Sequence, residues 1–423
     1  MFTADGQLYY PSKPEVGEEP NESVLPEMFG DFILVNGKTW PVLNVEPRKY
    51  RFRYLNGSDS RFYNLYFDHG IDFVQIGTDQ GLLNAPVKLS QLLLGCGERK
   101  DVIIDFSDPA LAGRTLIMRN NAHTPFPKGS AANPQTTGQI MAFKVVVPLN
   151  GTDSSVVPTT LRETPIAPLA KESITRRLIL AENLDELGRL KPQLGTIELG
   201  ALDYDDPITE NPMLDAIEEW DLINTTPDAH PIHLHLVNFQ VVSRQKFNQR
   251  KFVPGNPASL NLIGNPILPT ADESGWKDTQ IAYPGEVTRI KAKFDIEGLY
   301  VWHCHILSHE DHEMMRPFYV GSADLRIASN VKSGKFNVSV FPNPLTNKSV
   351  VNMEIYAEGE YKAELFNSMG QRISLLADSY YAKGTHEISL SQLPDSNLSN
   401  GVYLLRVQGS GGISSNKLLF KGY

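Results

Sequence analysis

Two short stretches of this chain concentrate residues that bind metals. The chain has ten histidines and two cysteines, and seven of the histidines lie in "HPIHLHLVNFQV" (230–241) and "HCHILSHEDHEMM" (303–315), with Cys304 between two of them. Imidazole and thiolate groups at short, fixed spacing are typical of transition-metal sites. The sequence therefore predicts metal binding, and the identity of the metal depends on how these side chains divide between sites.

The division follows from the geometry of an extended chain, because successive side chains of a β-strand point to opposite faces. His303 and His305 would then face one way and Cys304 the other. His233 and His235 would share a face, whereas His230 can turn away from it. Two sites are expected. The first contains Cys304, His230 and, from the loop beyond, His309 and Met314, with Met315 as a competitor for the place of Met314. The second contains His233, His235, His303 and His305.

The ligand types favour copper. Two imidazoles, a thiolate and a thioether are the ligand set of blue-copper centres, whereas four imidazoles alone suit copper, zinc, iron or nickel. Cys304 joins the two sites through a few backbone bonds, and zinc has no redox chemistry that would use this connection. A structural zinc site or histidines packed in a core are the alternatives that either histidine pair alone leaves open.

Other polar residues near the second stretch have several interpretations. Glu310 and Asp311 directly follow His309. A carboxylate there could deliver protons to bound oxygen, orient His309 or face solvent. His312 is expected to be a solvated side chain at the rim of the site.

The elements that must position these residues are β-strands. Short runs rich in β-branched and aromatic residues recur between Gly, Pro, Asn and Asp, which is typical of antiparallel sandwiches or barrels. Cys96, in "QLLLGCGERKDVIIDF", is expected to be a buried strand residue. We predict an all-β chain with β domains at 1–150 and 151–321, a linker at 322–334 and a small sandwich at 335–423.

The composition narrows the choice of partners. The net charge of −10 argues against nucleic acid, because such partners require a basic surface. No apolar run approaches the ~20 residues that span a bilayer. The opening residues lack the charged and then apolar pattern of a signal peptide.

With these residues in view, the two histidine stretches resemble the copper signatures of multicopper oxidases, particularly bilirubin oxidase and the bacterial spore-coat laccases. The similarity extends to "GDFILVNGKTWPVLNVEPRKYRFRYLNGS", "GLLNAPVKLSQLLLGCGERKDVIIDF" and "GWKDTQIAYPGEV", and it covers roughly residues 1–321. The resemblance implies two cupredoxin-like, Greek-key β-barrels or sandwiches. It also implies oxidation of a phenol, an aromatic amine or a bilirubin-like tetrapyrrole, coupled to reduction of dioxygen to water.

The resemblance also implies a role for each candidate residue. His230, Cys304, His309 and Met314 would bind type 1 copper, with Met314 ten residues after the cysteine, as in the family. His233 would bind type 2 copper, and His235, His303 and His305 the type 3 pair. His309 would lie nearest the substrate. Glu310 matches a carboxylate that the family uses in proton delivery.

One part of the family pattern is missing. Family members have three cupredoxin domains, and the first supplies the other half of the trinuclear copper cluster through two HxH pairs. This chain has no HxH before residue 233, and its opening "MFTADGQLYYPS" resembles the interior of a family member. We therefore expect domains two and three without the amino-terminal domain, and little oxygen reduction by the chain alone.

Two rival interpretations follow from that departure. The chain could be a secreted, non-catalytic protein that binds copper or transfers electrons through the type 1 site alone. It could also be a surface module stabilised by zinc, which would be colourless when loaded with metal.

The carboxyl-terminal part resembles a different family, the type A sorting domains of the Bacteroidetes type IX secretion system. The similarity rests on "VFPNP" (340–344), "ELFNSMGQ", "GVYLLRV" and the closing "KLLFK". It implies export across the outer membrane, with the secretion machinery as partner and a secreted or cell-surface location.

Overall fold

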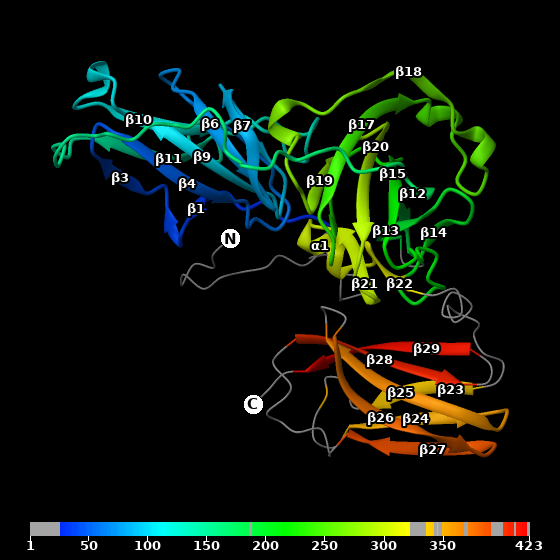
Figure 1. The fold of residues 1–423 in the computed structure, drawn as a ribbon. Coiled ribbons are helices and arrows are strands. Elements are labelled where there is room, and N and C mark those ends of the chain that lie inside the picture. Colours follow the sequence, from blue (N-terminus) through cyan, green and yellow to red (C-terminus); the bar gives the residue numbers. More distant parts are fainter. Residues whose placement is uncertain are drawn as a thin grey trace, which may run out of the picture. The chain divides into compact units, whose positions relative to one another are not determined.

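The computed structural model describes residues 26–185, 188–321, 336–341, 345, 349–367, 371–390, 401–409 and 412–420, which form β-strands in several sheets (Figure 1). The expectation of an all-β chain is confirmed. Within these residues the helical segments are α1 (Leu307–Asp311) and the short 3-10 turns η1 (Pro109–Leu111), η2 (Gln249–Lys251), η3 (Pro257–Ser259) and η4 (Ala271–Glu273). The opening stretch 1–25 and the expected linker 322–334 lie outside the described residues.

The first group of strands forms a sandwich, which we call the first sandwich. One sheet has the order β3-β11-β10-β5-β8, another has β4-β9-β6-β7, and β1 pairs with β2. The strands are β1 (Leu34–Val35), β2 (Lys38–Thr39), β3 (Val42–Val45), β4 (Lys49–Leu55), β5 (Tyr63–Phe67), β6 (Phe73–Thr78), β7 (Gly81–Leu89), β8 (Leu92–Leu94), β9 (Arg99–Asp105), β10 (Thr115–Asn120) and β11 (Gln139–Val145).

The core of the first sandwich follows from alternation along its strands. In β9, Val102 and Ile104 are fully buried, and they pack in one apolar cluster with Phe143 of β11 and Leu116 of β10. These residues come from both of the larger sheets, so the two apolar faces meet in a single core.

The second group of strands carries both histidine stretches. A seven-stranded sheet has the order β14-β13-β12-β15-β20-β17-β18, and a four-stranded sheet has β19-β16-β21-β22. The strands are β12 (Ile174–Leu184), β13 (Leu190–Thr196), β14 (Gly200–Leu202), β15 (Ala216–Asn224), β16 (His230–Leu234), β17 (Phe239–Phe247), β18 (Leu262–Ile267), β19 (Thr279–Ala282), β20 (Glu286–Phe294), β21 (Gly298–Cys304) and β22 (Met315–Val320). Because β16 and β21 are neighbours, residues 230–235 and 303–305 lie side by side.

The carboxyl-terminal strands form a small sandwich of sheets β23-β24-β27 and β26-β25-β28-β29. Its core includes Val351, Met353, Leu365 and Leu405, which come from both sheets. The strands are β23 (Phe336–Phe341), β24 (Val350–Ile355), β25 (Gly359–Asn367), β26 (Arg372–Tyr381), β27 (Gly384–Ser389), β28 (Gly401–Gly409) and β29 (Gly412–Phe420).

By compactness the chain divides into two units. One contains residues up to 201 together with 219–292 and 303–315, and the other contains 202–218, 293–302 and the residues from 316 onward. Both histidine stretches belong to the first unit. Within the described residues, no helix is both long and apolar enough to cross a membrane.

Two local expectations were wrong. Cys96 is buried, but it lies in the turn between β8 and β9, where Gly97 adopts a φ of +77° that an extended strand does not allow. His309 lies on the short helix α1 rather than in a loop. After that helix, Glu313 has a φ of +79°. The chain reverses there, so the N–H of Cys304 donates to the carbonyl of Met314 at 3.0 Å.

Candidate metal centre

One cluster forms around the sulfur of Cys304. His230 at the start of β16, Cys304 at the end of β21 and His309 of α1 bring their ligand atoms within 4.8 Å of one another. The Cys304 Sγ lies 3.6 Å from His230 Nδ1 and 3.9 Å from His309 Nδ1. Met314 is fully buried. We call His230, Cys304 and His309, together with Met314 as the fourth ligand expected from the sequence, the sulfur cluster.

The ring of His230 is held with one nitrogen toward the sulfur. Its Nε2 lies 2.7 Å from the hydroxyl oxygen of Thr226, and that hydroxyl donates to Asn224 Oδ1 at 2.8 Å. The hydroxyl oxygen therefore accepts the Nε2 proton, which leaves a lone pair on Nδ1 facing Cys304. Glu182 Oε1 is 3.4 Å from the same Nε2 and supports this tautomer.

The protonation of the sulfur cluster suits a bound cation. Burial raises the pKa of the Cys304 thiol well above its usual value. Burial, together with the neighbouring His230 and His312, lowers the pKa of His309 well below its usual value. His309 therefore need not lose a proton to bind, and a cation can displace the thiol proton of Cys304. His309 Nε2 is buried without a hydrogen-bond partner among the described residues.

A second cluster contains only imidazoles. His233, His235 and His303 bring their ligand atoms within 4.8 Å, and His235 Nε2 lies 3.1 Å from His303 Nε2. The ring centroid of His305 is 5.6 Å from that of His303 and 5.8 Å from that of His233. His305 Nδ1 is buried without a hydrogen-bond partner among the described residues. We call these four histidines the imidazole cluster.

Backbone carbonyls orient two of the imidazole rings. His233 Nδ1 lies 2.8 Å from the carbonyl oxygen of Asp278, and His303 Nδ1 lies 2.9 Å from that of Cys304. A carbonyl only accepts, so both Nδ1 atoms carry the proton and both Nε2 atoms keep a lone pair. The Nε2 of His303 and that of His235 must therefore share a proton or a cation, which fits a transition metal.

Glu310 lies against the imidazole cluster rather than His309. Its Oε2 is 3.2 Å from His303 Nδ1, and its side chain is 26% exposed. Burial would raise the pKa of Glu310, but the hydrogen bond and the charge of His303 outweigh burial and lower it. The carboxylate thus connects solvent with a ring of the imidazole cluster.

The residues that hold the rings were not predicted from the sequence. Thr226 and Glu182 contact His230, and Asp278 and Thr279 contact His233. Burial would raise the pKa of Asp278, but His233 and Arg99 lower it strongly. Asp278 and Thr279 lie in "GWKDTQIAYPGEV", a segment that the resemblance already contained. Their contact with His233 could not be read from it, because they are 45 and 46 residues away.

Comparisons with known families agree with both resemblances. Residues 191–324 match the family model described as multicopper oxidase, and this range includes every member of the two clusters. Residues 339–421 match the model described as a secretion system C-terminal sorting domain.

Curated relatives and solved structures extend the match upstream. A laccase of Bacillus subtilis (strain 168) is 45% identical over 316 residues, covering 74% of this chain and 59% of the relative. A bilirubin oxidase of Albifimbria verrucaria is 33% identical over 372 residues, covering 86% of this chain and 57% of the relative. The McoA multicopper oxidase of Aquifex aeolicus superposes with a TM-score of 0.57 at 26% identity, covering 76% and 64% of the two chains. The chain thus spans about three fifths of the length of these curated relatives.

Proposed function

This chain carries a multicopper oxidase domain, has laccase and bilirubin oxidase homologues, and ends in a secretion-system sorting domain, so we propose that it is the copper-binding part of an exported oxidase. The observation that carries the proposal is the division of consecutive residues between two clusters. Cys304 lies with His230 and His309, whereas His303 lies with His233 and His235.

In this proposal the sulfur cluster holds type 1 copper through the Nδ1 atoms of His230 and His309, the thiolate of Cys304 and the thioether of Met314. His233 binds type 2 copper, and His235, His303 and His305 bind the type 3 pair. Bound copper supplies reversible one-electron chemistry, and four electrons with four protons reduce one dioxygen to two waters.

The residues of the chain connect the two clusters. Cys304 is joined to His303 and His305 by the backbone, and His303 Nδ1 bonds to the Cys304 carbonyl at 2.9 Å. These bonds form a short electron path from thiolate to imidazole. Glu310 is a carboxylate at rest, and during turnover it accepts protons from solvent and passes them toward the cluster, which its partial exposure and its position 3.2 Å from His303 Nδ1 support.

The reductant donates its electron next to His309. Electron transfer does not require a close fit, so the substrate specificity is broad. The names of the relatives, a laccase and a bilirubin oxidase, support phenols, aromatic amines or bilirubin-like tetrapyrroles as reductants. The sorting domain supports export to the cell surface or medium through secretion machinery. The proposed domains are cupredoxin-like units at 1–150 and 151–321, a linker at 322–334 and the sorting domain at 335–423.

The ligand count limits what these residues do alone. The imidazole cluster offers four histidines, which is half the set that a trinuclear centre of this family uses. We propose that two further HxH pairs come from polypeptide outside these 423 residues. The complete sulfur cluster also favours a second candidate function, a non-catalytic copper-binding or electron-transfer protein that uses only the type 1 site.

Copper reconstitution of the full chain separates the candidates. We expect intense blue absorption without oxygen consumption on a phenolic substrate, and oxygen consumption once a domain carrying two HxH pairs is added. Blue colour that never leads to turnover, with or without that domain, favours the second candidate. A colourless copper-loaded protein contradicts both.

A further inference from the structure

The first sandwich reaches the imidazole cluster although all eight candidate ligands lie between residues 230 and 314. The contact is made by the turn at 95–98 and by Arg99, the first residue of β9. This segment reads "GCGER"; its Gly97 lies against His305, and its Arg99 reaches His233 through Asp278.

Gly97 leaves the space that the ring of His305 fills. A Cβ added to Gly97 would lie 2.5 Å from Cγ and 2.6 Å from Nε2 of His305, which is closer than nonbonded atoms come. The N–H of His305 donates to the Pro231 carbonyl at 2.7 Å, so the backbone at His305 is tied to β16 and the ring has little freedom to retreat. The turn thus restricts where the ring of His305 can lie in the imidazole cluster.

Arg99 holds the residue that orients His233. Its guanidinium donates to Asp278 Oδ1 at 2.7 Å and pairs with Asp278 Oδ2. The backbone carbonyl of Asp278 accepts the Nδ1 proton of His233 at 2.8 Å. Because the hydrogen-bond partner of a metal-binding imidazole fixes the tautomer and angle of the ring, Arg99 acts on His233 through Asp278.

A buried ion network makes this arrangement rigid. Lys277, next to Asp278, is 2% exposed, and its ammonium lies 2.9 Å from Glu98 Oε1 and 3.1 Å from Asp79 Oδ2. Asp79 Oδ1 also accepts the N–H of Arg99 at 2.8 Å. Both neighbours in the chain, Lys277 and Asp278, are therefore anchored to the first sandwich.

We propose that Gly97 and Arg99 are positioning residues for the imidazole cluster: Gly97 sets the ring of His305, and Arg99 sets the Nδ1-protonated ring of His233 through Asp278. The inference rests on the proposed metal-binding function of those rings. The first sandwich supplies no candidate ligand, but under this proposal it positions two of the histidines that bind metal.

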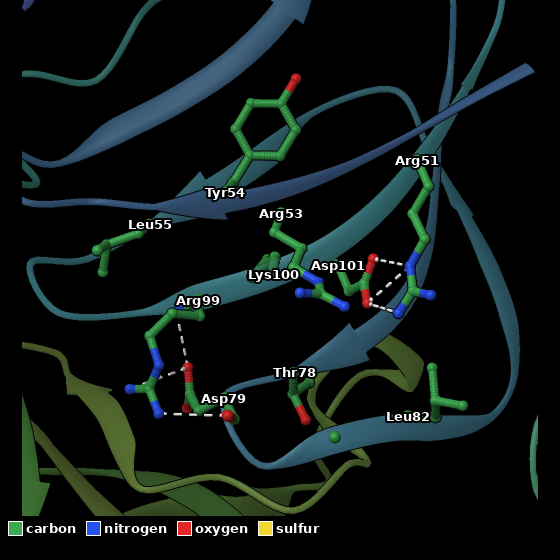
Figure 2. A pocket seen from close by; sticks show the side chains of 11 residues that line it. Arg51, Arg53, Tyr54, Leu55, Thr78, Asp79, Leu82, Arg99, Lys100 and Asp101 are labelled. Atoms are coloured by element: carbon green, nitrogen blue, oxygen red, sulfur yellow. Dashed lines mark hydrogen bonds and ion pairs between the residues drawn. The ribbon is translucent and has the colours of Figure 1, made fainter. Parts of the chain in front are cut away.

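A matched control lies on the same sheet. Arg51 of β4 also forms a two-oxygen pair with an aspartate, Asp101 of β9, but none of its described contacts leads to a histidine. Figure 2 shows Arg51 with Asp101 and Arg99 with Asp79 around one pocket of about 400 Å³. The Arg99 side chain is 35% exposed on this pocket, so its substitution does not leave a cavity in the core.

The first test uses the metal-free chain and histidine side-chain nitrogen NMR, with the His233 signals identified by their loss in His233→Gln. The wild type and Arg51→Met should show His233 protonated at Nδ1. Arg99→Met should show a mixture of tautomers, and Arg99→Lys an intermediate state. An unchanged His233 tautomer in Arg99→Met overturns the proposal, whether or not copper binds.

The second test measures Cu²⁺ affinity of the imidazole cluster in a Cys304→Ser background, where the sulfur cluster is disabled. Arg99→Met should lower this affinity about 10- to 100-fold relative to Arg51→Met. With Cys304 present, the blue absorption should be unchanged. Equal affinities in the two variants, or loss of the blue centre in Arg99→Met and Arg99→Lys, contradict the proposal. Absence of copper binding in the wild type instead contradicts the proposed function.

Gly97 is tested against Gly70, which has a φ of +67° and open space where a Cβ would lie, whereas the Cβ at Gly97 meets His305. Alanine at either position strains the backbone, but Gly97→Ala alone displaces the ring. In the same Cys304→Ser background, Gly97→Ala should lower Cu²⁺ affinity at least about tenfold more than Gly70→Ala. Equal effects of the two substitutions would remove Gly97 from the proposal.

Discussion

Cys304 and His303 are consecutive residues of β21, yet their side chains belong to different clusters. The Cys304 sulfur lies 3.6 Å from His230 Nδ1, whereas His303 Nε2 lies 3.1 Å from His235 Nε2. The alternation of an extended strand separates a thiolate from the imidazole beside it in sequence. The two clusters are nonetheless connected by a few covalent bonds.

Replacing the thiolate should abolish one centre and spare the other. Cys304→Ser removes the sulfur ligand, so we expect complete loss of blue absorption and retention of the imidazole-bound copper. Visible absorption and copper stoichiometry report the two effects. Cys96→Ser is the control, because Cys96 is also buried but its sulfur approaches the Arg61 carbonyl at 3.7 Å. Blue colour surviving in Cys304→Ser would contradict the assignment.

The Thr226 hydroxyl, which orients His230, should raise the copper affinity of the sulfur cluster. Thr226→Val removes the acceptor 2.7 Å from His230 Nε2, and we expect about a tenfold lower copper affinity in a competition titration followed by blue absorption. Thr225→Val is the matched control, because the Thr225 hydroxyl donates to the Leu180 carbonyl at 2.6 Å. Equal affinities in the two variants would show that the Thr226 contact is not required.

The ion pair between Glu273 and Arg244 should make the free energy of unfolding depend on pH in the acid range. Burial would raise the pKa of Glu273, but the hydrogen bonds and charge of Arg244 outweigh it and lower the pKa to about 2. The folded-state pKa is below the unfolded value. The stabilisation is therefore fully present above the usual glutamate range, and it is lost as pH falls through about 2.

Glu273→Gln should then destabilise the protein by about 3 kcal/mol at pH 7, and the difference from wild type should shrink below pH 4 to 5. Denaturant-induced unfolding at several pH values measures this. Glu198→Gln is the control, because Glu198 is 55% exposed and lies 3.8 Å from Arg177. A destabilisation that stays constant down to pH 3 would exclude the pair as its cause.

A buried arginine beyond the sulfur cluster should be important for stability. Arg316 is fully buried and donates to the carbonyls of Asp203, Asp206 and Pro207, the second of these at 3.0 Å. Arg316→Met removes the guanidinium that donates to all three carbonyls, and we expect a loss of at least about 3 kcal/mol in the free energy of denaturant-induced unfolding. Arg250→Met, at an exposed position, should change stability by less than about 0.5 kcal/mol. Similar values for the two would contradict this role.

The local part of the candidate site could be predicted from the sequence, and the long-range part could not. Alternation along "HCH" separates Cys304 from His303 and His305 because neighbouring side chains on a strand diverge, a rule that needs no tertiary information. The all-β class was predictable for the same reason, since alternating runs between turn residues recur along the chain.

Contacts between distant segments carry no such periodic signal. Arg99 meets Asp278 across 179 residues, and the need for glycine at 97 depends on a ring at position 305. Helix α1 was also missed, because five residues are too few to show a helical repeat. The chain reverses at Glu313, after this helix, and the Met314 carbonyl then accepts the N–H of Cys304.

Anomalous X-ray scattering at the copper edge, from crystals of the copper-loaded chain, tests the two-centre arrangement most directly. We predict one copper peak bounded by His230, Cys304 and His309, and separate copper density at His233, His235 and His303. A single peak contacted by both Cys304 and His303, or no copper beside Cys304, would contradict the account.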